Sequence, residues 1–137
     1  MPFAITQNCS INFGPFDVCI TPIPTPVGPV PVPIPYPNIS ISCTAIPSQF
    51  KVLTMCMPNH NLMTIVPMSN GDNAGIWLNP MSGMVMGPSR HLIGSMKTFM
   101  GGMPATKMLN PTGQNGLSPG VPGLSLTPCQ VKLMILS

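Results

Sequence analysis

The residues from Gly28 to Asn38 read GPVPVPIPYPN, with a proline at every second position from Pro29 to Pro37. In an extended strand, successive N–H groups point to opposite edges, so proline at a period of two removes the donors from one edge only. The same alternation places the prolines on one face and the residues Val30 to Tyr36 that lie between them on the other. We expect a strand along one side of the protein, with its apolar face inward and its blocked edge at a margin of the sheet.

An earlier proline series precedes this run in the opposite phase. It consists of Pro22, Pro24 and Pro26, and the phase changes at Val27-Gly28. Glycine tolerates the backbone angles that tight turns and bulges require. We therefore predict a tight bend or a bulge at this point.

The composition predicts a single all-β domain over residues 1–137. Apolar residues make up 44% of the chain and charged residues 5%, and the chain holds 20 prolines and 13 glycines. Disordered chains combine low hydrophobicity with high net charge, which this chain does not have. Proline at this frequency excludes long helices. We expect turns rich in proline and glycine, with little or no helix.

Three segments share one pattern, in which lysine is the second residue of a six-residue run that favours β structure. They are residues 50–55, 96–101 and 131–136, with Lys51, Lys97 and Lys132. The first two copies continue in step, since Met57-Pro58 matches Met103-Pro104. Repeated β units indicate a stacked or pseudo-symmetric body. We predict a small pseudo-three-sided β cone.

Charge and hydropathy exclude several classes of protein. Five Lys and Arg residues spread along the chain are too few and too scattered to follow a phosphate backbone, so we expect no nucleic acid partner. No apolar run is long enough to span a membrane, and the N-terminus lacks the regions of a signal peptide. We expect synthesis in the cytoplasm and any export by a route without a cleaved leader. The five cysteines are an odd number, which favours reduced thiols.

The residues that could support catalysis are few. General acid–base or nucleophilic catalysis needs a base held beside a nucleophile. The chain offers Asp17, Asp72, His60, His91 and its thiols, and no spacing singles out a pair. Asp72 lies in an Asn-Gly turn, where a carboxylate commonly caps its own backbone. We predict that the protein is not an enzyme.

Metal binding is the alternative function. Cys56 and His60 have a spacing compatible with two zinc ligands, and His91 could supply a third. Thirteen methionines also raise copper(I) as a ligand. The competing interpretation is structural, since free cysteine and methionine fill cores and a single histidine is usually hydrogen-bonded. A free-standing structural protein that binds zinc or copper is therefore kept as the second hypothesis.

Several ordered motifs, which span nearly the whole chain, resemble the PAAR-like family of spike-tip proteins. They are Phe16-Asp17-Val18-Cys19-x-Thr21-Pro22, the proline run to Asn38, Pro67 to Gly75, Met86 to His91, Phe99 to Ala105 and Thr127 to Lys132. The resemblance implies a β cone whose broad base caps the blunt end of a VgrG trimer, one tip per trimer, in a bacterial type VI secretion apparatus. It implies a tip that sharpens the spike for membrane puncture and carries effectors, without enzymatic turnover. A related phage-like contractile device remains an alternative setting.

The resemblance also bears on metal, partners and location. Classical PAAR tips hold zinc with three histidines and one cysteine, whereas this chain has only His60 and His91. At least two sulfurs would have to complete a tetrahedral site, and we select Cys19 and Cys56, with Cys43 and Cys129 next. The chain ends directly after the third lysine segment, so we expect effectors or their adaptors to bind from outside or to be carried by the VgrG. The tip would be cytoplasmic before firing, then exported on the spike, and would meet the target membrane only transiently.

Overall fold

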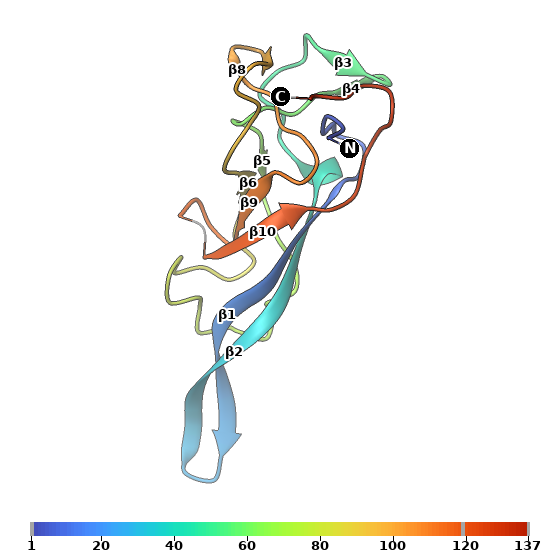
Figure 1. The fold of residues 1–137 in the computed structure, drawn as a ribbon. Coiled ribbons are helices and arrows are strands. Elements are labelled where there is room, and N and C mark those ends of the chain that lie inside the picture. Colours follow the sequence, from blue (N-terminus) through green and yellow to red (C-terminus); the bar gives the residue numbers. More distant parts are fainter. Residues whose placement is uncertain (1, 119, 137) are drawn as a thin grey trace.

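The computed structural model describes residues 2–118 and 120–136 as a tapering all-β body (Figure 1). Both ends of the chain lie at its broad end, and a two-stranded arm projects from the other end (Figure 1). The arm consists of β1 (Ile11–Thr25) and β2 (Gly28–Ile41). The one helical element among the described residues is a single 3-10 turn, Ser42–Thr44. The predicted all-β cone with little or no helix is confirmed.

The arm is a β-hairpin closed by a tight turn. Thr25 pairs with Gly28, so Pro26 and Val27 form the loop, and Gly28 has a φ of 134°. The predicted bend at Val27-Gly28 is therefore present, and it is the narrow tip of the molecule (Figure 1). A β-bulge between Gly14 and Asp17 marks the point where the arm leaves the body.

The two proline series lie opposite each other on the arm. Pro22 pairs with Pro31 and Pro24 with Pro29. Ile20, which is in phase with Pro22, donates its N–H to Leu78 O at 3.1 Å on the side away from β2. The backbone nitrogens of the prolines in both strands therefore lie on the outer edges of the hairpin. The N–H groups that hydrogen-bond β1 to β2 belong to the other residues and are retained. Proline thus blocks both outer edges of the distal arm, where we predicted one.

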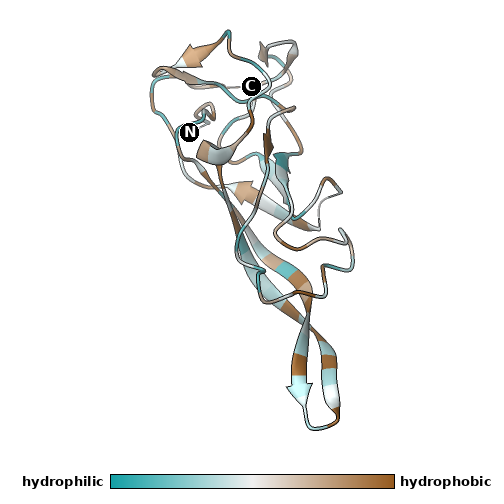
Figure 2. Cartoon of the chain, turned by 180° about the vertical axis from the view of Figure 1, so that it is seen from behind, coloured by the Kyte–Doolittle hydropathy of each residue, from teal (hydrophilic) through white to brown (hydrophobic). Residues whose placement is uncertain are grey.

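The burial of β2 follows the predicted alternation. Val32, Ile34 and Tyr36 are half-buried, whereas the five prolines of the run and Val30 are exposed. Seen from behind, hydrophobic and more polar residues alternate along the arm (Figure 2). The inward apolar face is thus present from Val32 to Tyr36, and it is lost towards the tip because no other element covers it there.

Six antiparallel strands form the main sheet, in the order β2-β1-β10-β9-β6-β5. The strands added to the arm are β10 (Val121–Ser125), β9 (Pro111–Gln114), β6 (Ser89–His91) and β5 (Ile65–Val66). Strand β2 is the edge of this sheet, as the proline pattern predicted. Two further hairpins stand apart at the broad end: β3 (Leu53–Thr54) with β4 (Met57–Pro58), and β7 (Phe99–Met100) with β8 (Met103–Pro104).

The interior contains few large apolar side chains. One apolar cluster lies at the broad end, where Leu133 packs against Ala4, Met100, Ala105 and Ile135. Most of the other buried residues are asparagine, serine, threonine or glutamine. Many of these side chains hydrogen-bond across neighbouring strands, which favours one arrangement of those strands. For example, Ser10 Oγ lies 3.1 Å from Ser125 Oγ, and Ser89 Oγ donates to Ser40 Oγ at 2.7 Å.

The loop of residues 67–88 covers one part of the arm. Asn70 exchanges two backbone hydrogen bonds with Ile39 of β2, both at 2.7 Å. Gly71 and Gly75 approach the strands so closely that an added Cβ would lie 1.8 Å from Pro37 O and 2.2 Å from Cys19 Cβ, respectively. The loop therefore covers the arm where Asp17 and Cys19 point inward.

Candidate docking surface and metal centre

The broad end is closed by a ring of three backbone hydrogen bonds. Ile5 N donates to Thr106 O at 3.1 Å, Thr106 N donates to His60 O at 3.2 Å, and His60 N donates to Ile5 O at 2.8 Å. Each of three segments thus donates to the next and accepts from the one before. The ring surrounds a local pseudo-three-fold axis, although all three segments belong to one chain.

A second set of three equivalent hydrogen bonds surrounds the ring and runs around the axis in the opposite sense. Two residues beyond each ring member, a backbone N–H donates to the neighbouring segment: Gln7 to Pro58, Leu62 to Pro104 and Met108 to Phe3, at 3.1, 3.0 and 2.8 Å. One residue before each ring member, the N–H donates to the third residue of a lysine segment: Ala4 to Leu133, Asn59 to Val52 and Ala105 to Thr98. The three lysine segments are therefore structurally equivalent.

A polar side chain holds the start of each lysine segment. Gln49 Oε1 accepts from Val52 N at 2.9 Å and Gln130 Oε1 accepts from Leu133 N at 2.7 Å. In the middle copy, Ser95 Oγ accepts from Thr98 N at 3.1 Å. Each side chain lies three residues before the segment's third residue. This capping position belongs to the repeat, although its residue differs between the copies: Gln49, Ser95 and Gln130.

The predicted three-sided body is present, with two differences in detail. The six-residue segments contain only two-residue strands, or in the third copy a single bridge between Met134 and Phe3. The third copy is also completed by the other end of the chain, because residues 2–5 take the place that Met57-Pro58-Asn59-His60 takes in the first copy. The third copy therefore begins near the C-terminus and is completed at the N-terminus, so its two halves are not consecutive in the sequence.

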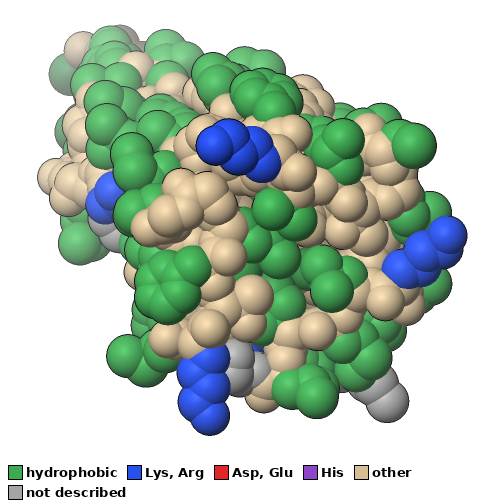
Figure 3. Space-filling model, turned by 90° about the horizontal axis from the view of Figure 1, so that it is seen from above, with side chains coloured by type: hydrophobic (Ala, Val, Ile, Leu, Met, Phe, Trp, Pro, Cys, Tyr) green, Lys and Arg blue, Asp and Glu red, His purple; other side chains and the backbone are tan. Residues whose placement is uncertain are grey.

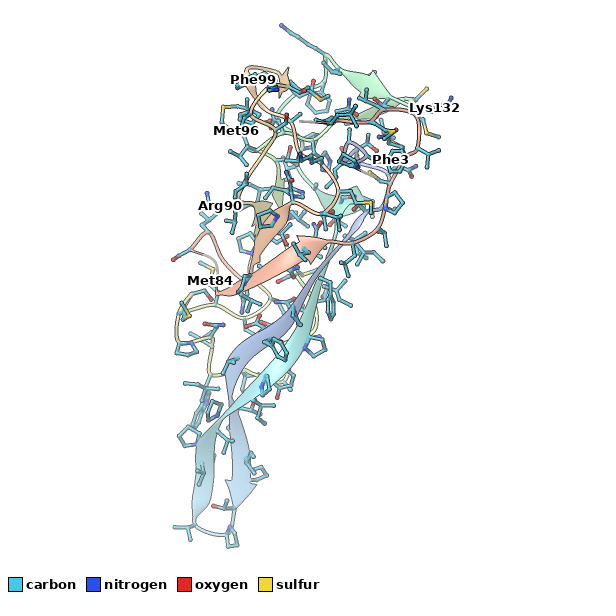
Figure 4. The ribbon with its side chains drawn as sticks, in the orientation of Figure 1. Phe3, Met84, Arg90, Met96, Phe99 and Lys132 are labelled. Carbon is cyan, nitrogen blue, oxygen red and sulfur yellow. The ribbon has the colours of Figure 1, made fainter. Side chains whose placement is uncertain are left out.

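The outer surface of the broad end is apolar and carries separated cations. The first residues of the three segments, Phe50, Met96 and Val131, are 70%, 88% and 69% exposed, and the lysines that follow them are also exposed. Viewed from above, hydrophobic side chains cover much of this end, between separated lysine and arginine side chains (Figure 3). Phe3, Met96, Phe99 and Lys132 all lie at this end (Figure 4). We call this surface the base; it consists of the exposed and half-buried residues in the ranges 2–3, 50–58, 96–104 and 131–136.

The residues predicted as metal ligands lie in different places. Cys56 is exposed in the β3–β4 turn of the base, and His60 is buried in the backbone ring. His91 is buried on β6, and Cys19 is buried on β1 beneath the loop of residues 67–88. Within the described part of the chain, Cys19 is the one member of this set that belongs to a group of three potential ligands. A site formed by all four residues therefore stays a prediction.

The group around Cys19 contains the only two acidic residues of the chain, Asp17 and Asp72. All three side chains are fully buried. The Cys19 thiol donates to Asp17 Oδ1 at 3.5 Å and to Asp72 Oδ2 at 3.6 Å. The three ligand atoms lie within 4.8 Å of one another. The turn motif around Asp72 predicted only a local backbone cap, and no spacing in the sequence connects Asp72 with Asp17 and Cys19.

Neighbouring amides and backbone groups orient the two carboxylates. Asn38 Nδ2 donates to Asp17 Oδ2 at 2.6 Å, and Asn79 Nδ2 donates to Asp17 Oδ1 at 2.7 Å. Met86 N donates to Asp72 Oδ2 at 3.0 Å, whereas Asp72 Oδ1 has no hydrogen-bond partner among the described residues. Such donors stabilise ionised carboxylates. The Asp17–Cys19–Asp72 group is thus held by both strands of the arm and the loop that covers them.

The electrostatics of this group favour protons or a cation. Burial and the two neighbouring carboxylates raise the pKa of the Cys19 thiol to about 12. Burial also raises the pKa of Asp72, despite the hydrogen bond from Met86 N. Neither shift has a lysine or an arginine among its causes. Buried charges without a counter-charge are costly, so this group could hold a metal ion.

The toxin PAAR-like domain matches residues 10–120 of the chain. The chain belongs to the PAAR-like family. Membership implies a role at the tip of a type VI secretion spike, and domains of this family are structural and typically non-catalytic. No curated protein and no solved structure matches the chain. No helix among the described residues is long and apolar enough to cross a membrane.

This PAAR-like chain does not offer the three-histidine, one-cysteine set of the classical tips. It has two histidines, and the group of three potential ligands in its described residues uses two aspartates and one cysteine. Carboxylate oxygen and cysteine sulfur are both zinc ligands, with bonds of about 2.0–2.3 Å. Two tetrahedral ligands at such distances lie roughly 3.5 Å apart, and the two measured S–O distances are 3.5 and 3.6 Å. The donor set therefore fits a metal, although with different residues.

The two histidines of the PAAR-like domain predict acid sensitivity. Burial lowers the pKa of His60 to about 4 and that of His91 to about 3, and neither His60 Nε2 nor His91 Nδ1 has a partner among the described residues. In the unfolded chain the two histidines protonate near pH 6.5, whereas in the folded chain they stay neutral to a lower pH. The free energy of unfolding therefore has its full value above pH 6.5 and falls as the pH drops towards 4. We expect urea unfolding with a chelator present to show a loss of about 2 kcal/mol or more between pH 7 and pH 5.

The variant His60→Asn is the control for this pH dependence. It should be less stable at pH 7 but should lose less stability on acidification, because one of the two titrating groups is gone. An unchanged unfolding free energy of the unmodified protein between pH 7 and pH 5 would mean that the histidines are not buried as neutral groups.

Proposed function

We propose that this chain caps the blunt end of a VgrG trimer through its base, as the tip of a type VI secretion spike. The observation that carries the proposal is the ring of Ile5, His60 and Thr106 with the three equivalent lysine segments around it. A trimer presents the same surface three times around its axis. One chain with pseudo-three-fold symmetry can offer equivalent contacts to all three subunits, which a chain without internal symmetry cannot.

The composition of the base supports protein docking. Its apolar residues provide area that gains stability when it leaves water, and Lys51, Lys97 and Lys132 provide cations at equivalent positions. Both acidic residues of the chain are buried where the loop of residues 67–88 packs on the arm, Asp17 on β1 and Asp72 in the loop itself. The base therefore presents positive charge without acidic side chains, which favours acidic or carbonyl-rich surfaces on the partner.

The arm suits the leading end of a spike. No charged residue lies between Asp17 and Lys51. Charged side chains are the ones that cost most in a bilayer core, so the arm brings no charged side chain from Val18 to its tip and back to Phe50 into contact with a membrane. Its outward prolines restrict the backbone and prevent the arm from pairing with strands of other molecules. We infer transient membrane contact during puncture, and carriage of effectors or their adaptors on the spike.

The test is to mix the purified chain with a VgrG trimer and to measure the mass of the complex. We expect a complex that contains one copy of this chain and three copies of VgrG, because the base already supplies all three docking positions. Either a monodisperse chain that does not bind the trimer or a complex with three copies of this chain would overturn the proposal.

A second proposal concerns metal. Two buried carboxylates and a thiol with suitable spacing support one zinc ion held by Asp17, Cys19 and Asp72. Zinc would supply the positive charge that the described surroundings of these groups lack, and its binding would release the thiol proton. We propose a structural role, in which the metal fastens the covering loop to the arm.

Elemental analysis of protein purified without added metal tests the zinc proposal. We expect about one zinc per chain, and a melting temperature that falls when a chelator is added. Asp72→Asn should abolish zinc retention, whereas Cys56→Ser is the matched control and should keep it. A metal-free protein that melts at one temperature with and without chelator would exclude the site. Zinc lost from the Cys56→Ser variant would favour the sequence-predicted ligand set instead.

A further inference from the structure

Two exposed cysteines lie where the arm meets the rest of the chain. Cys9 precedes β1, and Cys43 lies in the 3-10 turn that follows β2. All five cysteines of the chain are free. The function proposed above uses neither Cys9 nor Cys43.

The pairing at the end of the arm places these two cysteines close together. Ile11 pairs with Ile41 at the end of the β1–β2 ladder. The pairing continues one step further, since Ser42 N donates to Ser10 O at 2.9 Å and Ser10 N donates to Ser42 Oγ at 2.6 Å. Cys9 and Cys43 are the next residues beyond this hydrogen-bonded pair. Cys9 has a φ of 41° and Cys43 lies in the 3-10 turn, so the Ser10–Ser42 hydrogen bonds, and not a regular strand ladder, bring the two cysteines together.

The two side chains also interact directly. A side-chain hydrogen bond with Cys43 is the largest cause that raises the pKa of Cys9. Gln7 Nε2 donates to Ala45 O at 2.8 Å and lies 3.5 Å from Cys43 O, so a second side chain joins the N-terminal segment to the 3-10 turn. The segments that carry the two thiols are thus held together on both sides of the pair.

The remaining cysteines are less able to compete. Cys129 is buried, its sulfur accepts from Thr6 N at 3.0 Å, and it also contacts Ala4 O at 3.6 Å. Cys19 is buried between the two carboxylates, and Cys56 is exposed on the base in the β3–β4 turn. Of the five thiols, Cys9 and Cys43 are therefore the pair that is both exposed and next to hydrogen-bonded neighbours, Ser10 and Ser42.

We propose that Cys9 and Cys43 form a disulfide when the chain meets a disulfide oxidant outside the reducing cytosol. The reaction is thiol–disulfide exchange: the thiolate of one cysteine attacks the oxidant, and the second thiolate then displaces the reduced half from the mixed disulfide. The two thiols lose two protons and two electrons in total, and the oxidant is reduced to two thiols. Because the raised pKa of Cys9 keeps its thiolate scarce at neutral pH, the exchange is slow there and faster at alkaline pH.

The disulfide would lock the point where the arm meets the rest of the chain. It would close a loop that contains the whole arm and fix the start of the N-terminal segment, whose residues 2–5 form the third copy of the repeat together with residues 131–136. Closing a loop of this length lowers the entropy of the unfolded chain, so the oxidised protein should be the more stable form. The inference does not depend on VgrG binding, since it rests on the hydrogen bonds at the end of β1 and β2.

The test is to oxidise the full chain with oxidised glutathione at pH 8, block the remaining thiols and map the peptides without reduction. Cleavage before Asp17 and after Lys51 separates Cys9 from Cys43, because no lysine or arginine precedes Lys51. We expect a link between the peptides 1–16 and 17–51, with the blocking group on Cys19 so that the bond is assigned to Cys43, and a melting temperature about 5 °C or more above that of the reduced protein. The Cys56→Ser variant is the control and should form the same link.

The Cys43→Ser variant should lose both the link and the increase in melting temperature. Glutathione attached separately to Cys9 and Cys43, or a link from Cys9 to Cys129, would overturn the proposal. Because the peptide map of the unmodified chain decides between these outcomes, the test does not depend on whether the variant folds.

Discussion

An aspartate placed at any one of three equivalent positions on the base is expected to weaken binding to a VgrG trimer by about a hundredfold. The variants are Phe50→Asp, Met96→Asp and Val131→Asp. A charge buried without a partner in an interface costs about 2–4 kcal/mol, which corresponds to this loss. Because these side chains are 70%, 88% and 69% exposed, the variants should fold normally. Titration of each variant against the trimer provides the three dissociation constants.

The matched control places the same charge at the other end of the molecule. Val27 is 99% exposed at the tip of the arm. Val27→Asp should bind the trimer as tightly as the unmodified chain. Equal losses at the three base positions would support pseudo-three-fold docking. A loss at only one of them would indicate an asymmetric contact, and a loss at Val27 would place the docking surface on the arm.

Gly71→Ala is expected to destabilise the fold by about 3–5 kcal/mol. Gly71 has a φ of 137°, and a Cβ there would lie 1.8 Å from the carbonyl oxygen of Pro37. Since that oxygen belongs to the backbone of β2, the clash can be relieved only if the loop moves away from the arm. Chemical denaturation measures the change in the free energy of unfolding.

Gly28 is a matched control for this substitution. Its φ is 134°, nearly that of Gly71, but a Cβ there would meet nothing within 4 Å. Gly28→Ala should therefore show only the backbone strain, about 1–2 kcal/mol. The difference between the two variants isolates the close packing of the loop on the arm. Equal destabilisation would mean that the loop does not pack on Pro37.

The sequence was most informative where backbone chemistry is decisive. Proline at every second position predicted an edge strand, and β2 is the edge of the main sheet. The second proline series completed this arrangement in a way that was not foreseen. Because Pro22 and Pro24 face Pro31 and Pro29 across the hairpin, both outer edges are blocked. The pairing of the two series depends on the turn at Pro26-Val27, which sets the register.

The three lysine segments predicted the symmetry but not the length of the strands. Leu53–Thr54 and Phe99–Met100 are only two residues long, and each pairs within its own hairpin, whereas the segments that follow them make the hydrogen bonds around the axis. The third copy is split between the two ends of the chain. Phe3 occupies the position of Pro58 and Pro104 in the other two copies, and it is not a proline. Similarity between the segments therefore could not identify residues 2–5 as part of the third copy.

The group of Asp17, Cys19 and Asp72 was beyond what spacing could predict. Motifs for metal sites depend on ligands that are close in sequence, whereas Asp72 reaches Cys19 only because the loop folds back over the arm. One signal was available: a chain with only two acidic residues, one of them two positions from a cysteine. In a protein with so few charges, each carboxylate is a candidate for a specific role.

The most direct test of the proposed docking is an electron microscopy reconstruction of this chain on a VgrG trimer. We predict that the base contacts the trimer, that Lys51, Lys97 and Lys132 each face a different subunit, and that the arm points away along the trimer axis. A reconstruction in which the arm of β1 and β2 enters the trimer, or in which only one lysine segment contacts it, would contradict the proposed function.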